Sequence, residues 1–252
     1  MSKRQWQSGV RIALAAAIIL GGLAIAPAEA QVIRVSRSDA RNLVGVNLGY
    51  FMLRGEDSRG GDEREDVLLA NLDDLLFEVG DFNGATVNGE WVYGVSDYLE
   101  VAAGIGFYQK TVPSIYRNFE DSDGSEIEQD LKLRIVPITA TVRFLPLPRG
   151  SAVEPYIGAG VGFFNWRYSE TGEFIDFSDG TIFRDTFSAD GNAVGPVIVA
   201  GLRFPVGDVW TFGGEYRWQR AEGDTDSAES GLLADKIDLG GQSIGFTFHF
   251  RF

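Results

Sequence analysis

Seven charged residues stand at polar positions of segments that are otherwise rich in Val, Ile, Phe and Gly. They are Glu90, Glu100, Glu215, Arg143, Arg203, Arg217 and Arg251. Carboxylates and guanidinium groups that face one narrow space can nearly neutralise one another, because bidentate pairing with Arg offsets the cost of burying a charge. We expect a fixed network of ion pairs. A charge-lined path for a small solute or a proton is the alternative.

Residues for covalent or metal chemistry are scarce. The chain has one histidine, His249, and no cysteine, so neither a Cys nucleophile nor a zinc site with two His ligands can be built. Carboxylates that could act as acid and base are too common in the polar segments to indicate a site. The sequence therefore predicts no catalytic residue, no cofactor and no metal.

The segments that carry the seven charges alternate apolar and polar residues, which is the pattern of β-strands with one apolar and one polar face. The last segment is the clearest, because its even positions are all large and apolar: Ile244, Phe246, Phe248, Phe250 and Phe252. Seven earlier segments alternate in the same way: 44–52, 87–95, 99–107, 136–144, 157–163, 194–204 and 210–218. Apart from 157–163, which has seven residues, the apolar rows span about nine to eleven residues, the length that a tilted strand needs to cross a bilayer.

The connections between these segments alternate in length. Long ones cover 54–83, 110–130, 169–192 and 221–236, whereas short ones cover 96–97, 145–153 and 205–208. Long loops at one end and tight turns at the other are typical of outer-membrane barrels. The predicted fold is all-β: an eight-stranded antiparallel up-and-down transmembrane β-barrel with long extracellular loops.

The amino-terminal 30 residues are predicted to be a cleaved signal peptide. Lys3, Arg4 and Arg11 precede an apolar run over 12–26, and a small-x-small ending closes at Ala30. This leaves 31–252 as the barrel domain. The whole chain carries a formal charge of −14, and removal of the leader makes it more acidic still, which excludes nucleic acid as a partner.

Two further features concern the barrel interior and its mouth. Inward glycines, such as Gly104 and Gly158, would be covered by the rings of Tyr98, Tyr108 and Tyr156, or would leave a cavity. The first long connection also contains a helical pattern of five leucines that would cap the mouth or lie against the outer leaflet. They are Leu68, Leu69, Leu72, Leu75 and Leu76.

Three of these features together resemble a known family. They are the run Pro-Tyr-Ile-Gly-Ala-Gly-Val-Gly at 155–162, the eight alternating segments, and the run Gly-Phe-Thr-Phe-His-Phe-Arg-Phe at 245–252. The chain resembles the small eight-stranded bacterial outer-membrane barrels of the OmpW and OmpA-domain kind. The resemblance implies an outer-membrane location, contact with lipid and lipopolysaccharide, and recognition of the C-terminal strand by the barrel-assembly machinery.

The resemblance leaves the function open between two classes. OmpW-like proteins imply a narrow apolar channel, so the first hypothesis is a plugged or narrow pore that passes small apolar or weakly polar solutes. OmpA-like domains imply an anchor, so the second is a surface interaction or structural barrel with acidic loops and no transport. A soluble lipocalin-like binder is the third. The oligomeric state stays open.

Overall fold

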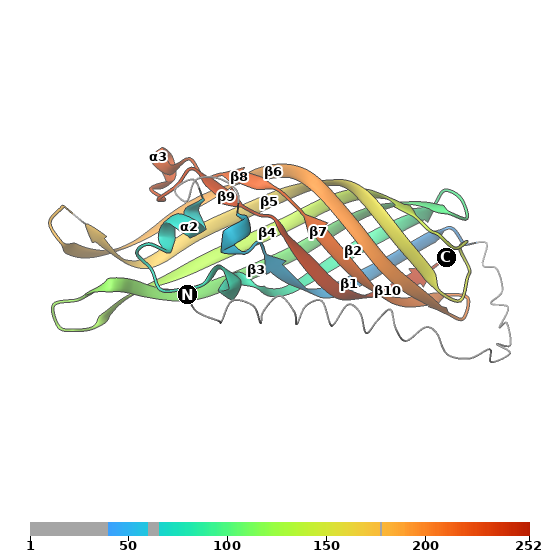
Figure 1. Cartoon of the computed structure of the whole chain (residues 1–252), viewed down its shortest axis with the longest axis horizontal. Helices are drawn as coiled ribbons and strands as arrows, with labels where there is room; N and C mark the ends of the chain where they lie inside the picture. Colours follow the sequence, from blue (N-terminus) through green and yellow to red (C-terminus); the bar gives the residue numbers. More distant parts are fainter. Residues whose placement is uncertain (1–39, 60–65, 177) are drawn as a thin grey trace, which may run out of the picture. The chain divides into compact units, whose positions relative to one another are not determined.

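Eight antiparallel strands close into a barrel in the order β1-β10-β7-β6-β5-β4-β3-β2 (Figure 1). The computed structural model describes residues 40–59, 66–176 and 178–252, so the predicted signal peptide lies outside the described residues. The strands are β1 (Asn42–Leu53), β2 (Gly84–Gly94), β3 (Leu99–Glu120), β4 (Glu126–Phe144), β5 (Glu154–Asp176), β6 (Thr181–Val206), β7 (Trp210–Gln219) and β10 (Gly241–Arg251). The predicted eight-stranded barrel is confirmed.

Two connections carry further small elements. Between β1 and β2 lie the 3-10 helices η1 (Glu56–Ser58) and η2 (Val79–Phe82), with the short helix α2 (Val67–Asn71) between them. Between β7 and β10, the two-stranded sheet β8 (Glu222–Asp224) and β9 (Lys236–Asp238) flanks the helix α3 (Ser227–Ser230). No helix in the described ranges is long and apolar enough to cross a membrane.

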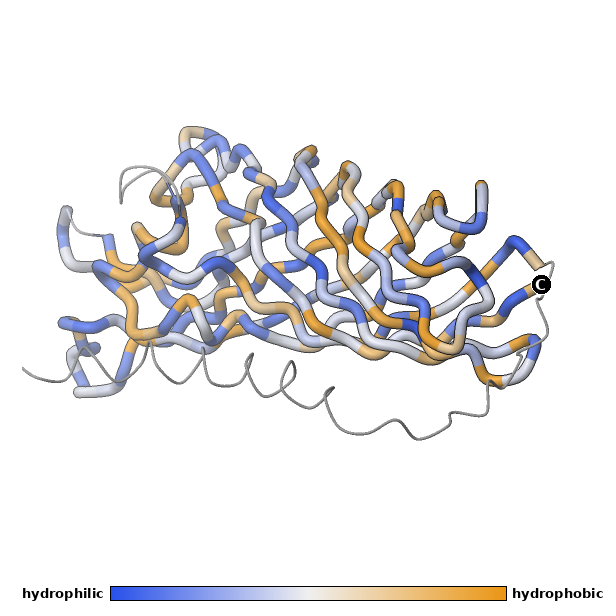
Figure 2. Tube along the Cα trace, turned by 45° about the vertical axis from the view of Figure 1, so that its right-hand side comes forward, coloured by the Kyte–Doolittle hydropathy of each residue, from blue (hydrophilic) through white to orange (hydrophobic). Residues whose placement is uncertain are grey.

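The predicted apolar rows face outward on every barrel strand. Hydropathy alternates along the strands in Figure 2, and the apolar positions of β10 are exposed, with Phe246 at 83%. A soluble ligand-binding barrel needs these rows inside, so the prediction of a lipocalin-like binder is wrong. The exposed belt is the surface that lipid would cover.

Two predicted loops are instead long β-hairpins. The connection predicted over 110–130 is strand up to Glu120 and again from Glu126, and the one over 169–192 is strand up to Asp176 and again from Thr181. The prediction failed because strands were recognised only where the outward-facing alternate positions are apolar. In these extensions apolar residues change face: on β4, Leu131, Leu133 and Ile135 are fully buried inside.

The change of face marks one edge of the apolar belt. Beyond the last outward apolar residues, the outer surface carries long polar side chains. They are Gln109 on β3, Arg134 on β4, Arg167 on β5, Arg220 after β7 and Gln242 on β10. Because charged side chains are costly against hydrocarbon, this ring sets the upper limit of the membrane-spanning part. The end of the barrel beyond it is called the loop end below, and the opposite end, with the short connections, the turn end.

A charged substitution should reveal where the membrane lies. Phe246→Arg places a guanidinium in the middle of the outward row of β10 and should cost about 2–4 kcal/mol of unfolding free energy, whereas Thr111→Arg, on the outward face of the β3 extension, should cost about 0–1 kcal/mol. Urea unfolding of both variants in lipid vesicles measures the two values. Equal costs would contradict the assigned edge.

Candidate functional site

At the turn end, the lumen is filled by an ion network centred on Arg143 of β4. Its guanidinium contacts the Glu90 carboxylate of β2 at 2.5 Å and the Glu215 carboxylate of β7 at 3.2 Å. Glu215 also accepts hydrogen bonds from the Tyr156 hydroxyl at 2.8 Å and from Arg217 at 3.0 Å. These groups come from four strands, so they cross-link the barrel wall through its interior.

A second group of ion pairs lies beside the first. Arg203 of β6 contacts Glu100 of β3 at 2.7 Å and Glu154 of β5 at 3.6 Å. Glu154 also accepts from Arg251 of β10 at 3.0 Å, and Arg149 approaches Glu100 at 3.5 Å. The name lumen network is used below for both groups together.

Tyr156 joins the two groups. The guanidinium carbons of Arg143 and Arg203 lie 5.0 and 4.9 Å from its ring centroid. A ring between two guanidinium groups offers each of them a cation–π contact, which separates the like charges without water. Tyr156 itself fills the space over Gly201, where a Cβ would come within 2.5 Å of the tyrosine ring and hydroxyl.

His249 belongs to the same network. Its Nε2 lies 2.7 Å from Glu90 Oε1, and the side chain is fully buried. The imidazole ring lies over Gly45 of the neighbouring strand β1, where any Cβ would overlap ring atoms. The imidazole of His249 therefore packs against strand β1, and its Nε2 contacts the carboxylate of Glu90.

The structure brings all seven sequence-predicted charges together in the lumen network. The sequence analysis missed Glu154 and Arg149, because both were counted in or beside the short connection that precedes β5. The signal that could have found Glu154 is its position directly before Pro155, on the same parity as Tyr156. The prediction for Tyr98 is wrong: it lies in the turn before β3 and is 49% exposed, so of the three predicted tyrosines Tyr108 and Tyr156 alone point inward.

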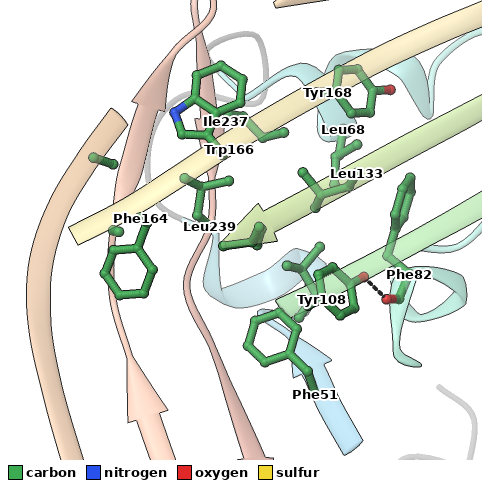
Figure 3. Packing of buried hydrophobic residues seen from close by; sticks show 14 of the residues in the cluster. Phe51, Leu68, Phe82, Tyr108, Leu133, Phe164, Trp166, Tyr168, Ile237 and Leu239 are labelled. Carbon is green, nitrogen blue, oxygen red and sulfur yellow. Dashed lines mark hydrogen bonds between the residues drawn. The ribbon is translucent and has the colours of Figure 1, made fainter. Parts of the chain in front are cut away.

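Above the network, toward the loop end, the lumen is filled by apolar side chains. Figure 3 shows this cluster, in which Phe51, Tyr108, Leu133, Phe164 and Trp166 come from the barrel wall. Trp166 and Phe164 are fully buried. The remaining partners come from the connections: Leu68 of α2, Phe82 of η2, and Ile237 and Leu239 at β9. The long connections therefore fold into the barrel mouth.

Asp66 holds the first connection in place. Its carboxylate accepts hydrogen bonds from the backbone N–H groups of Leu68 and Leu69, which caps α2, and from both Arg59 Nε at 3.0 Å and Nη2 at 2.8 Å. The backbone N–H of Asp238 in β9 donates to the same carboxylate at 2.7 Å. One buried side chain thus fastens the first and last long connections to each other.

The predicted leucine helix is shorter than its pattern suggested. Helix α2 ends at Asn71, and of the five leucines Leu68 and Leu75 are buried, Leu69 and Leu72 are partly buried, and Leu76 is 43% exposed. After the helix, the backbone N–H of Leu76 donates to the carbonyl oxygen of Ile115 on β3. The leucines cap the barrel mouth, and the alternative position against the outer leaflet does not fit the burial of Leu68 and Leu75.

Asn71 ties the same connection to the β5 extension. Its side-chain amide donates to the Tyr168 hydroxyl at 3.1 Å and to the Glu170 carboxylate. Glu170 lies beyond the upper edge of the belt and is only 5% exposed. Burial raises the pKa of Glu170 above its ordinary value of 4.5, and the hydrogen bonds from Asn71 and Tyr168 oppose part of this rise.

Metal-binding groups are not assembled anywhere in residues 40–59, 66–176 and 178–252, since no three His, Cys, Asp or Glu side chains there are grouped to hold an ion.

The five outward positions of the C-terminal strand, Ile244, Phe246, Phe248, Phe250 and Phe252, are all exposed. Trp210 of β7 stacks on Phe248 at 4.9 Å between ring centroids. The outer aromatic surface near the turn end is therefore continuous across β7 and β10.

Comparison with known proteins gives a consistent family match. A family model for the outer membrane protein beta-barrel domain matches residues 14–252. The solved structure of the outer membrane protein OprG from Pseudomonas aeruginosa is 12% identical, covering 86% of this chain and 97% of its own, with a TM-score of 0.50. Neisserial surface protein A (NspA) is 13% identical, covering 84% and 97%, with a TM-score of 0.46. No curated protein sequence matches the chain.

Removing the central guanidinium should be far more damaging than removing an exposed one. Arg143→Met removes the guanidinium that Glu90 and Glu215 share, which leaves Glu90 with His249 alone and Glu215 with Tyr156 and Arg217, and should cost about 3–5 kcal/mol of unfolding free energy. Arg184→Met breaks an outward ion pair with Glu173, in which the Arg184 side chain is 80% exposed, and should cost about 1 kcal/mol or less. Urea unfolding in detergent-free vesicles compares the two variants. Similar costs would show that the lumen network is energetically marginal.

The buried Glu170 should make stability depend on pH. Because its folded-state pKa is raised, its contribution is fully present below about pH 4.5 and is lost as pH rises through the folded-state pKa, by about 1.4 kcal/mol for each unit of rise. Glu170→Gln stays neutral and keeps an oxygen for Asn71, so its stability relative to the wild type should grow above pH 4.5. Midpoints of heat-modifiability on gels, from pH 4 to 8, measure this. A difference that does not change with pH would contradict the assignment.

Proposed function

Since this chain belongs to the outer membrane protein beta-barrel family and is therefore a protein of the bacterial outer membrane, we propose that it is a barrel closed to bulk flow that anchors a rigid platform outside the cell. The platform consists of the β3–β4 and β5–β6 hairpins and the two folded connections. Of the two function classes left open by the sequence, this is the surface-anchor hypothesis. The proposal retains the plugged lumen of the first hypothesis but not the passage of small solutes through it.

One observation carries the proposal: the lumen is occupied at two successive levels. At the turn end, the lumen network spans it with side chains from seven strands, and Arg143 and Arg203 are at most 1% exposed. Toward the loop end, Trp166, Phe164 and Leu133 pack against the folded connections. The interior of an eight-stranded barrel is just wide enough for side chains to fill, so each filled level alone is enough to close it.

The platform is supported by the way the loop end is built. The β5–β6 pairing continues without a break to Asp176 and Thr181, well beyond the polar ring (Figure 1). The β3–β4 pairing also passes the ring, but its register shifts between Ile115 and Glu120 before the last pair, Glu120 with Glu126. A hairpin with a continuous ladder has few conformations to lose on binding, so it presents a fixed surface to a partner. The surface is acidic, as is the whole chain.

The proposal includes no catalytic role and two envelope partners. His249 is the one histidine of the chain, and its Nε2 is occupied by Glu90. The barrel-assembly machinery is proposed to recognise β10, whose outward Phe row lies at the seam where β10 pairs with β1. Lipid and lipopolysaccharide are proposed to cover the outward belt below the polar ring.

Planar-bilayer recordings with purified protein test the closed state. The wild type should show no steady open-channel current. Deleting 56–81 removes the contribution of the first connection to the upper level, and the triple variant Glu90→Ala, Arg143→Ala, Glu215→Ala removes the centre of the lower level, so each should remain near baseline. The two changes combined should conduct.

The matched control is Glu173→Ala with Arg184→Ala, an ion pair on the outer surface, in the background of the 56–81 deletion. It should stay at baseline, because it leaves the lumen network intact. Steady solute-dependent openings of the wild-type protein would instead support the narrow-pore hypothesis and would overturn the proposal.

A further inference from the structure

A small pocket lies at the loop end, outside the lumen network. It has a volume of about 200 Å³ and is formed by α2 and the residues after it, by β3 to β6, and by the segment after α3. Six of its lining residues matter here: Tyr116, Gln129, Glu170, Phe174, Phe187 and Leu233. The volume is below the range of about 300–1,000 Å³ of sites for drug-sized ligands, so any occupant is small.

The inner part of the pocket offers hydrogen-bond acceptors. Glu170 is 5% exposed, and no ion pair joins it to a basic residue of the described part of the chain. Gln129 is 4% exposed and uses its amide nitrogen to donate to the Tyr116 hydroxyl and the Glu173 carbonyl. Its Oε1 is buried and has no hydrogen-bond partner among the described residues. The Gln129 amide oxygen therefore lacks a donor, and the Glu170 carboxyl group, which accepts from Asn71, lacks a cationic partner among the described residues.

The walls of the pocket are aromatic. Phe174 and Phe187 form an edge-to-face pair with ring centroids 4.7 Å apart, and Phe174 also stacks on Phe183 at 5.9 Å. Phe183 and Leu233 also line the pocket and are 38% and 57% exposed, so part of its wall reaches solvent. Aromatic faces attract cations, and apolar rings accommodate the hydrocarbon part of a ligand.

The aromatic wall is held in place by the segment after α3. Gly231 has φ of +74°, and a Cβ there would come within 2.7 Å of the Phe187 ring. The last long connection therefore approaches Phe187 as closely as a glycine permits. The pocket is thus a built feature of the platform, with contributions from both folded connections and both hairpins.

From this geometry we propose that the pocket binds a small organic ammonium ion with an apolar body, such as an arylalkylamine. The ammonium group donates to Glu170 and to Gln129 Oε1, and the apolar body packs among Phe174, Phe187 and Tyr116. The ammonium group supplies a counter-ion to the buried Glu170 carboxylate. This favours binding, because a buried charge without a counter-ion is costly. This site is independent of whether the lumen conducts.

Calorimetric titration with 2-phenylethylammonium and with its neutral isostere 2-phenylethanol tests the proposal. The full-length mature protein is placed in nanodiscs of zwitterionic lipid, and empty nanodiscs are subtracted to remove partitioning. The wild type should bind the ammonium ion saturably at one site, at least about 10-fold more tightly than the alcohol, because a hydrogen-bonded ion pair replaces a neutral contact. Absence of saturable binding, or equal affinity for both compounds, would overturn the proposal.

Two substitutions locate the site. Glu170→Gln should lower the affinity for the ammonium ion by about 10-fold or more while leaving that for the alcohol within about 3-fold. Phe187→Leu should lower the ammonium affinity by about 2- to 5-fold through loss of the aromatic face. If Glu170→Gln does not fold, as judged by heat-modifiability on gels, the ratio of ammonium to alcohol binding in the wild type still decides the proposal.

Glu173→Gln is the matched control. It makes the same change of charge on the same strand, but Glu173 faces outward and pairs with Arg184. Ammonium binding should be unchanged in this variant. An equal loss in Glu173→Gln and Glu170→Gln would show that the ligand responds to the general acidity of the surface, and the assigned site would be wrong.

Discussion

The constraint on which this structure depends is the narrowness of an eight-stranded barrel, whose inward side chains must find all their partners within the lumen. Arg143 illustrates the consequence, because its guanidinium is buried and has to be neutralised by carboxylates from other strands, Glu90 and Glu215. Burying such groups is costly, and the cost is offset only while every member of the group is present. The ion pairs therefore fix how the strands stand relative to one another, and they also close the lumen.

A second consequence follows from the height of the bilayer. Below the polar ring, the apolar side chains face outward to the lipid, and the charged side chains face inward to the lumen. Above it, water lies outside the wall, so polar residues such as Arg167 face outward and apolar ones such as Leu133 and Trp166 turn inward. This exchange creates an apolar core at the loop end, and the two long folded connections cover it. The loops are therefore part of the folded core at this end of the barrel.

The loop end also keeps an ionisable side chain where an apolar one would fold more easily. Glu170 is buried and its pKa is raised, yet Asn71 and Tyr168 are arranged around it. A polar group retained at a cost to stability, beside aromatic rings and an opening to solvent, has the character of a binding site. In this respect the platform differs from the lumen network, where each carboxylate already has its cation.

By itself the sequence determined the barrel, the outward belt and the seven charges of the lumen, because a period of two assigns each residue to a face without knowledge of its neighbours. Only the tertiary structure decided which charges pair, since Glu90 of β2 and Arg143 of β4 meet inside the lumen although β3 lies between their strands. It also decided that 110–130 and 169–192 are hairpins and that Glu170, Gln129 and Phe187 line one pocket. These contacts join segments far apart in the chain, and alternation along one strand contains no information on what lies opposite it.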